Sequence, residues 1–294
     1  MTISAQMVKE LRERTGLGMM ECKAALTEAN GDMDAAADIL RKKAGAKLEK
    51  KSGRTAADGA IAIHTASDGK TAGIVEINSE TDFVAKGDDF LDFARKVAAR
   101  VATSNPSDID ALLKMPADDG KTTTIAQSLE ALVAKLGEKM GVRRFERWSS
   151  AAAIGSYVHG RKIGVLVELK GGDAELAKDI AMHVAASRPE CVSKEQVPAE
   201  RIAKEKEIFV EQAQQSGKPA NIIEKMVEGR INKFLNEISL LGQPFVKDPD
   251  TTVEKLLKSK GAQVLRFVRY EVGEGIEKKA SDFAAEVMAT VKGG

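Results

Sequence analysis

Residues 1–45 carry apolar side chains at the spacing of three short amphipathic helices. The apolar face of the first helix is formed by Met7, Val8 and Leu11. Ser4 or Thr2 can cap this helix, Gly16 stops it, and Asp32 is placed to cap the third helix. Such a short unit would be marginally stable alone. The basic, alanine-rich stretch that follows is predicted to be a helix end and a linker.

Most of the remaining chain consists of two copies of one pattern. Each copy begins with a β-hairpin and a helix: strands 59–65 and 72–78 with helix 89–102, and strands 155–159 and 163–170 with helix 174–187. Each copy ends with another helix and a third strand: residues 125–140 and 142–148, and residues 253–259 and 263–272. The pattern predicts an α+β fold with a duplicated ββααβ core, in which helices cover two three-stranded antiparallel sheets.

The two copies differ at two places. The first has a long loop at residues 79–88, where the second has only residues 171–173. The second copy contains an insert at residues 194–243 that is predicted to be an antiparallel helical hairpin. Its returning arm has a coiled-coil-like apolar seam formed by Ile223, Val227, Ile231, Phe234, Ile238 and Leu241. A short C-terminal helix is expected at residues 281–291.

These features divide the chain into five predicted parts. A Gly-Leu-Gly-Met turn makes the first part similar to ubiquitin-associated (UBA) three-helix domains. The parts are a UBA-like module with its linker (1–53), a first core subdomain (54–148), a second core subdomain (149–193 and 244–275), the helical hairpin (194–243) and a C-terminal module (276–294).

Composition and charge restrict the partners. The formal net charge is +1, from 45 Lys and Arg against 44 Asp and Glu, and aromatic residues make up 4%. Direct nucleic-acid binding is not expected, because it usually requires surplus positive charge or stacking aromatics. Cys22 and Cys191 lie far apart, which indicates a reducing compartment. No apolar run reaches the roughly 18 residues that span a bilayer and residues 1–10 lack a secretory pattern, so we expect a cytoplasmic protein without membrane contact.

The sequence offers no convincing catalytic motif. Residues 69–71 and 120–122 read Gly-Lys-Thr, as at the end of a phosphate-binding loop, but both lack the earlier glycine of that motif. The three histidines lie on different predicted elements without metal-ligand spacing. His183 is predicted to be a core histidine, and Cys22 to be packed. We expect no catalytic residues, no cofactor and no metal site.

The lengthened loop of the first copy contains the most unusual residue. Phe83 stands there between Asp82 and Val84. Two interpretations are equally compatible with the sequence. Phe83 is held out for a partner, or it folds back over Phe90 and Phe93.

Several segments resemble the bacterial elongation factor Ts family. The residues Val8–Met20 resemble its opening signature and 81–85 its second signature. Further similar segments follow in family order, at residues 159–167, 183–187, 242–246 and 271–276. The resemblance covers essentially the whole chain.

The resemblance implies a guanine-nucleotide exchange factor for elongation factor Tu, the GTPase that delivers aminoacyl-tRNA. It implies that one stretch disturbs the magnesium site of this GTPase: Thr81, Asp82, Phe83 and Val84. It implies partner contacts by Val8, Leu11, Met19, Met20 and His159. The helical hairpin would correspond to a coiled-coil or dimerisation subdomain, with possible self-association.

The residues alone leave two other function classes open. One is a UBA-like adaptor that binds a partner through residues 1–53 without affecting its nucleotide. The other is an NTPase that uses a Gly-Lys-Thr turn.

Overall fold

The computed structural model describes residues 3–51, 53–120, 122–215, 217 and 219–277. The three predicted N-terminal helices are α1 (Ala5–Thr15), α2 (Met19–Glu28) and α3 (Met33–Lys51). Ser4 caps α1 by accepting a hydrogen bond from the Met7 amide, and Gly16 ends it in the left-handed region at φ 70°. The other proposed cap, Thr2, lies outside the described residues.

The predicted linker at the end of this module is largely helical. Helix α3 continues to Lys51, because the stretch after Leu40 is rich in alanine and lysine, which are strong helix formers. The single Gly45 within it does not interrupt the helix.

The first half of the core contains the predicted hairpin, helices and third strand. Its elements are β1 (Asp58–Thr65), β2 (Thr71–Ser79), α4 (Asp82–Ala85), α5 (Asp88–Ser104), α6 (Ile109–Lys114), α7 (Ile125–Leu136) and β3 (Met140–Ser149). The predicted helix over 125–140 is too long. Gly137 adopts φ 80° and ends α7, so Met140 begins β3 instead.

The second half repeats the skeleton and adds the helical hairpin. Its elements are β4 (Ala153–His159), β5 (Ile163–Lys170), α8 (Ala174–Ser187), η1 (Lys194–Gln196), α9 (Ala199–Gln214), α10 (Ala220–Ile238), η2 (Leu240–Gly242), β6 (Pro244–Phe245), β7 (Asp248–Thr252), α11 (Val253–Ser259) and β8 (Gln263–Glu271). Pro198 and Pro219 precede α9 and α10, where a missing N–H costs nothing. Neither α6 nor the β6–β7 hairpin was predicted. The predicted helix at 281–291 lies outside the described residues.

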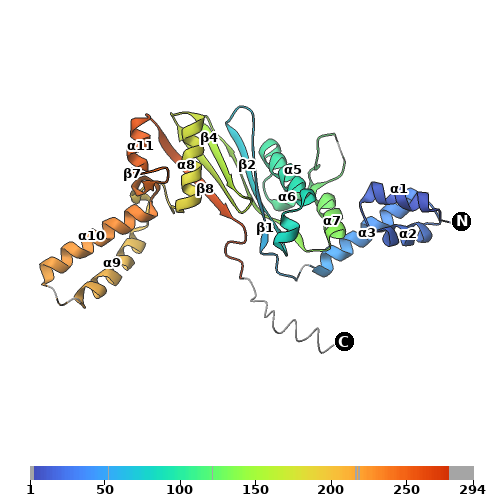
Figure 1. Cartoon of the computed structure of the whole chain (residues 1–294), viewed down its shortest axis with the longest axis horizontal. Coiled ribbons are helices and arrows are strands. Elements are labelled where there is room, and N and C mark those ends of the chain that lie inside the picture. Colours follow the sequence, from blue (N-terminus) through green and yellow to red (C-terminus); the bar gives the residue numbers. More distant parts are fainter. Residues whose placement is uncertain (1–2, 52, 121, 216, 218, 278–294) are drawn as a thin grey trace.

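The two antiparallel sheets, β1-β2-β3 and β4-β5-β8, lie face to face at the centre of the molecule (Figure 1). Side chains that alternate along the strands fill the space between them, including Ile74, Trp148, Leu166 and Tyr270. Helices α5 and α7 cover the outer face of the first sheet, and α8 and α11 cover that of the second. The core therefore has four layers, in the order helix, sheet, sheet, helix.

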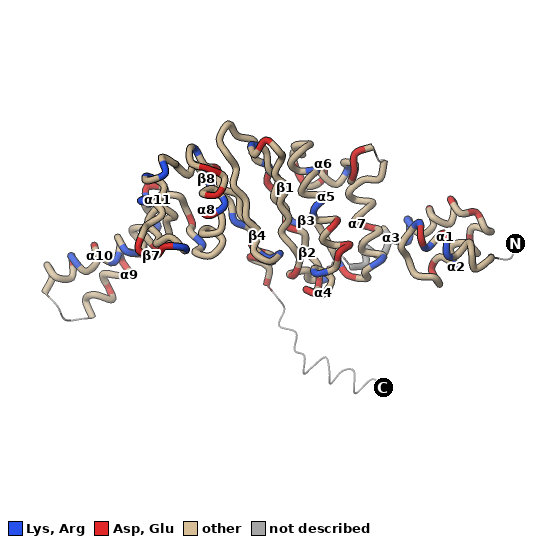
Figure 2. Tube along the Cα trace, turned by 45° about the horizontal axis from the view of Figure 1, so that its top comes forward, with Lys and Arg blue, Asp and Glu red and all other residues tan. Residues whose placement is uncertain are grey.

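The remaining helices lie at opposite ends of this sandwich. In Figure 1 the three-helix module extends from one end and the α9–α10 hairpin from the other. Basic and acidic residues are interspersed along the described chain (Figure 2). No helix among the described residues is long and apolar enough to cross a membrane.

Candidate partner-binding site

The lengthened loop of the first copy contains a helix of one turn, α4, which presents Phe83 to solvent. The Phe83 side chain is 83% exposed. Phe90 and Phe93 are buried in the core between the first sheet and its helices. The interpretation in which Phe83 folds back over these two residues is therefore wrong. The exposed ring of Phe83 is thus available to contact a partner.

Thr81 caps α4 and is itself held by a residue that the sequence analysis missed. The Val84 amide donates to Thr81 Oγ1 at 3.3 Å. The Thr81 hydroxyl donates to Glu138 Oε1 at 2.6 Å, and the Thr81 amide donates to Glu138 Oε2 at 3.0 Å. Glu138 lies in the turn between α7 and β3, 57 positions further along the chain.

A second glutamate makes the reverse connection between the same two turns. Glu80 Oε1 accepts a hydrogen bond from the Lys139 amide at 2.6 Å. Arg54, in the segment that follows the N-terminal module, donates to Glu80 at 3.3 Å. The two turns are thus joined by a pair of glutamates, each bonded to an amide of the opposite turn. We call Glu80 and Glu138 the glutamate clasp.

Asp82 is held as a charged carboxylate at the surface. Lys86 Nζ lies 2.5 Å from Asp82 Oδ2, and Arg161 Nη2 lies 4.0 Å from the same oxygen. The hydrogen bond and charge of Lys86, with a smaller contribution from Arg161, lower the pKa of Asp82 below its usual value. Arg161 comes from the turn between β4 and β5, so the second half of the core contributes a cation to this site.

The β4–β5 turn is fastened beside the first sheet. The Ile61 amide donates to the carbonyl of Arg161 at 2.8 Å, and Lys162 Nζ donates to Asp58 Oδ1 at 3.1 Å. His159, at the end of β4, is exposed, and its Nδ1 lies 3.0 Å from the Tyr157 hydroxyl. The structure therefore connects the His159 turn to the neighbourhood of Asp82. The contact role of His159 stays a prediction.

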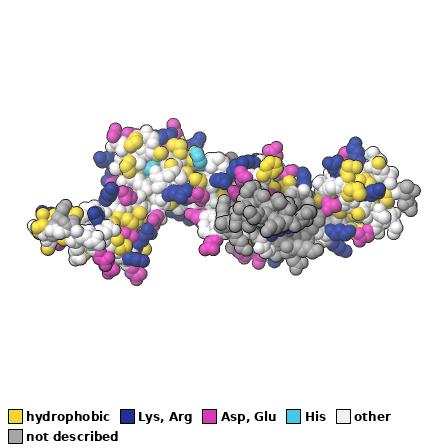
Figure 3. All heavy atoms as spheres, turned by 60° about the horizontal axis from the view of Figure 1, so that its bottom comes forward, with side chains coloured by type: hydrophobic (Ala, Val, Ile, Leu, Met, Phe, Trp, Pro, Cys, Tyr) yellow, Lys and Arg dark blue, Asp and Glu magenta, His cyan; other side chains and the backbone are white. Residues whose placement is uncertain are grey.

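The proposed contact residues of the N-terminal module fall into two groups. Met19 and Met20 begin α2 and are 59% and 76% exposed. Figure 3 shows exposed hydrophobic side chains gathered on this module. Val8 and Leu11 are buried in the core of the three helices and cannot touch a partner in this conformation. We therefore keep Met19 and Met20 as proposed contacts and assign Val8 and Leu11 to the module's own packing.

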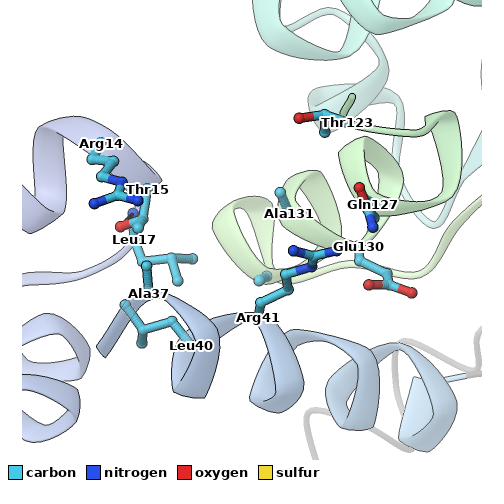
Figure 4. A pocket seen from close by; sticks show the side chains of 11 residues that line it. Arg14, Thr15, Leu17, Ala37, Leu40, Arg41, Thr123, Gln127, Glu130 and Ala131 are labelled. Carbon is cyan, nitrogen blue, oxygen red and sulfur yellow. Dashed lines mark hydrogen bonds between the residues drawn. The ribbon is translucent and has the colours of Figure 1, made fainter. Parts of the chain in front are cut away.

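The cavity between the module and the core is lined mainly by α3 and α7 (Figure 4). Its volume is about 310 Å³. Arg41 reaches from α3 towards Gln127 and Glu130 on α7, while Leu17 and Leu40 line its apolar side (Figure 4). Arg14 at its rim is paired with Asp34 at 2.8 Å. We interpret the cavity as the joint between module and core, because its lining comes from both.

The other candidate chemistry is structural. Gly69 and Lys70 lie in the β1–β2 turn, where Asp68 Oδ1 accepts a hydrogen bond from the Lys70 amide at 2.8 Å, and Thr71 begins β2. Lys121, in the other Gly-Lys-Thr, lies outside the described residues. His183 and Cys22 are fully buried, as predicted. Among the residues that the structure describes, no group of three His, Cys, Asp or Glu side chains could hold a metal ion.

The sequence is similar to those of known proteins along its whole length. The sequence model of the family described as "Elongation factor TS" matches residues 80–274. The elongation factor Ts of Methylococcus capsulatus is 64% identical over 293 residues, covering 99% of each chain. Those of Alkalilimnicola ehrlichii and Thioalkalivibrio sulfidiphilus are 60% and 59% identical and are covered in full. The chain belongs to the elongation factor Ts family.

The matched region includes the residues of the candidate site. The matched region of the elongation factor Ts model begins at residue 80, directly before Thr81, and contains all of α4. It also contains Glu138 and Arg161, the two residues that hold Thr81 and Asp82. The three-helix module with Met19 and Met20 lies outside this match. The alignment with the Methylococcus capsulatus relative, however, covers 99% of the chain and so includes this module.

Proposed function

We propose that the chain is a guanine-nucleotide exchange factor for elongation factor Tu in translation elongation. Family membership supports the activity and the partner. The observation that carries the site is the 83% exposure of Phe83 on the capped turn α4. An exchange factor of this kind acts by binding, without catalytic residues or a cofactor of its own.

We propose that α4 acts by displacing the magnesium site of the GTPase. Mg²⁺ requires nearly ideal octahedral geometry, so a small shift of its ligands weakens the hold on the nucleotide phosphates disproportionately. Phe83 would enter between elements of the partner, with Asp82 beside it. Linkage requires that a factor which weakens nucleotide binding is itself bound less tightly when nucleotide is present.

Phe83 needs help from other contacts. A thousandfold acceleration of GDP release corresponds to lowering the barrier by about 4 kcal/mol. Burial of one phenylalanine contributes about 1.5–3 kcal/mol. We propose that Met19, Met20 and the turn at His159 supply the remainder by gripping the GTPase at separate places.

The structure supports a protein partner more than a nucleic acid. Basic and acidic positions are interspersed along the described chain (Figure 2), and the net charge of +1 gives little general attraction to a phosphate backbone. The helical hairpin closes around Ala213 and Val227, while Ile208 and Ile222 stay exposed. Its self-association stays a prediction, as does the cytoplasmic location.

The test compares Phe83→Ala with a matched control from the second half of the core. Leu265 is an exposed apolar residue on β8, which belongs to the second sheet, whereas α4 follows β2 of the first sheet. We expect the wild type and Leu265→Ala to accelerate release of fluorescent GDP from elongation factor Tu equally. Phe83→Ala should slow the accelerated rate at least about tenfold, since tenfold corresponds to about 1.4 kcal/mol.

Two results would contradict the proposal. One is a wild-type protein that binds the GTPase without changing GDP release, which would favour the adaptor interpretation. The other is an unchanged rate with Phe83→Ala, which would leave the exchange activity and remove Phe83 from it.

A further inference from the structure

We infer that Glu138 is a positioning residue of the exchange site, which orients α4 without touching the partner. The inference rests on the proposed function. Both carboxylate oxygens of Glu138 are bonded to Thr81, one to its hydroxyl at 2.6 Å and one to its amide at 3.0 Å. Glu138 therefore contacts the first residue of the motif at its backbone and its side chain together.

Helix α4 needs such external support. It has only four residues, and one isolated helical turn is unstable because its nucleation fixes several dihedral angles for few hydrogen bonds. Ala85 is its only fully buried residue, and Phe83 points into solvent. The direction of Phe83 is thus set by the backbone of α4 and not by packing of its ring.

The hydroxyl of Thr81 couples Glu138 to the helix. A hydroxyl has one hydrogen to donate and two lone pairs to accept with. A carboxylate can only accept, so the hydroxyl hydrogen must point to Glu138. A lone pair is then left facing the Val84 amide, which donates to it at 3.3 Å. The negative charge of Glu138 strengthens its hydrogen bonds and, through the shared hydroxyl, the cap on α4.

Glu138 is itself fixed in place. Gly137 ends α7 in the left-handed region, which sends the chain directly into the turn. The next amide, that of Lys139, donates to Glu80 at 2.6 Å, and Lys139 Nζ donates to the Arg54 carbonyl at 2.7 Å. The glutamate clasp therefore joins α4, the α7–β3 turn and the segment that leads from the N-terminal module.

Loss of Glu138 should affect exchange differently from binding. The other proposed contacts, Met19, Met20 and the turn at His159, are distant from Glu138 in sequence and keep their own support. Without Glu138 the Thr81 hydroxyl can rotate and α4 can fray, so Phe83 spends less time in one direction. The maximal rate of GDP release then falls more than the affinity for the GTPase.

The experiment compares Glu138→Ala, Glu138→Gln and the control Glu175→Ala, which removes an exposed glutamate from the first turn of α8. Three quantities are measured on the full-length proteins. They are the GDP release rate at saturating factor, the affinity for nucleotide-free elongation factor Tu by calorimetry, and the hydrogen-exchange rate of the Val84 amide in the free protein by NMR.

We expect Glu138→Ala to lower the saturating rate about tenfold, equivalent to about 1.4 kcal/mol, with an affinity change of less than about threefold. Its Val84 amide should exchange about tenfold faster than in the wild type, on the same scale of about 1.4 kcal/mol. Glu138→Gln should recover only part of the rate, because its single amide oxygen can accept from the Thr81 hydroxyl, whereas its NH2 group cannot accept from the Thr81 amide. Glu175→Ala should match the wild type in all three measurements.

Three results would overturn the inference. The first is a wild-type GDP release rate in Glu138→Ala. The second is an equal loss of rate and affinity, which would indicate general damage or a direct contact. The third is an unchanged exchange rate of the Val84 amide. Because this rate is measured on the free protein, it tests whether Glu138 positions α4 even if the wild type does not release GDP and the proposed function is wrong.

Discussion

The two halves of the core carry equivalent residue pairs at equivalent positions of their sheets. Glu76 on β2 lies opposite Arg144 on β3, and Glu168 on β5 lies opposite Arg266 on β8. In both halves the strand register shifts directly after the glutamate. Four residues beyond each arginine stands an aromatic, Trp148 or Tyr270. A β-bulge at the same position in both copies is strong support for the duplication.

The arginines of these pairs also connect the halves. Arg144 of the first half lies over the Tyr270 ring of the second at 4.1 Å, and Arg266 of the second lies over the Trp148 ring of the first at 4.2 Å. Both rings donate to the same carboxylate, that of Glu146. The joint between the sheets is thus built from two related cation–π contacts.

The halves differ at the corner that follows the middle strand. In the second half Gly171 adopts φ 74°, and a Cβ there would lie 2.4 Å from the Gly261 carbonyl oxygen, so the two turns approach through their backbones. In the first half the equivalent turns are joined by the glutamate clasp and leave room for α4. At the same corner, two turns pack against each other through their backbones in the second half, whereas in the first half they carry α4 with its exposed Phe83.

The largest expected difference between the halves concerns their buried glutamates. Glu76 is fully buried and bonded by Arg143, Arg144 and the Gly273 amide, whereas the partner of Glu168 on β8, Arg266, is half exposed. Glu76→Ala should lower the free energy of unfolding by about 3–5 kcal/mol, because it removes the buried carboxylate that two partly buried arginines and the Gly273 amide share. Glu168→Ala should cost about 1.5 kcal/mol, the loss of hydrogen bonds to a charged group. Urea denaturation at pH 7 measures both.

The pKa values of Glu76 and Glu168 are both lowered, and Glu76 shows the cause most clearly. Burial alone would raise the pKa of Glu76, but the hydrogen bonds from the Gly273 amide, Arg143, Asn78 and Arg144 outweigh burial and lower it. The folded protein therefore takes up this proton only below the ordinary value of 4.5, and the contribution of Glu76 is lost as the pH falls below that value. If Glu76→Ala and Glu168→Ala lower the free energy of unfolding by the same amount at pH 7, the two glutamates contribute equally to stability and the expected difference is wrong.

A smaller effect is expected at the corner itself. Gly171→Ala places a Cβ against the Gly261 carbonyl at a positive φ, so it should cost about 1–3 kcal/mol of stability. Ser79 is the equivalent residue of the first half, and its hydroxyl donates to the Thr81 carbonyl at 2.9 Å. Ser79→Ala should cost about 1 kcal/mol, the value of one hydrogen bond. Thermal unfolding of both variants measures the difference, and a tolerated alanine at Gly171 would contradict the backbone contact.

The regular skeleton of both halves could be predicted from the sequence because its signals are local. The Asp-Gly turn at Gly69 fixed the first hairpin, and Pro198 and Pro219 marked the two helical arms. The end of α7 was placed too late because Leu136 and Met140 continue the helical period past Gly137. The β6–β7 hairpin was missed because β6 has only two residues, too few for a pattern.

The candidate site could be predicted only in part. The position of Phe83 in a lengthened loop indicated a contact, but its exposure depends on α4, whose single turn has no periodicity. The roles of Glu138 and Arg161 could not be predicted from the sequence. These residues contact Thr81 and Asp82 only because the strands pair and the two halves pack together. Contacts between residues far apart in sequence leave no local signal in a single chain.

The smallest expected effect is a pH dependence confined to the second half. The Val246 amide donates to His183 Nδ1 at 3.1 Å, so the proton of the buried ring sits on Nε2, which donates to Gln243 Oε1 at 2.9 Å. Burial lowers the pKa of His183, and the Gln243 bond only partly opposes it. The unfolded chain therefore takes up this proton first, and stability should fall as the pH drops below about 6.5, by at most about 1.4 kcal/mol per pH unit. His183→Asn, which keeps an acceptor for the Val246 amide, should flatten the dependence of the unfolding free energy on pH between pH 7.5 and 5.5. The control His159→Asn, at the exposed turn, should retain the wild-type dependence. Equal slopes in all three proteins would show that another group causes the pH dependence.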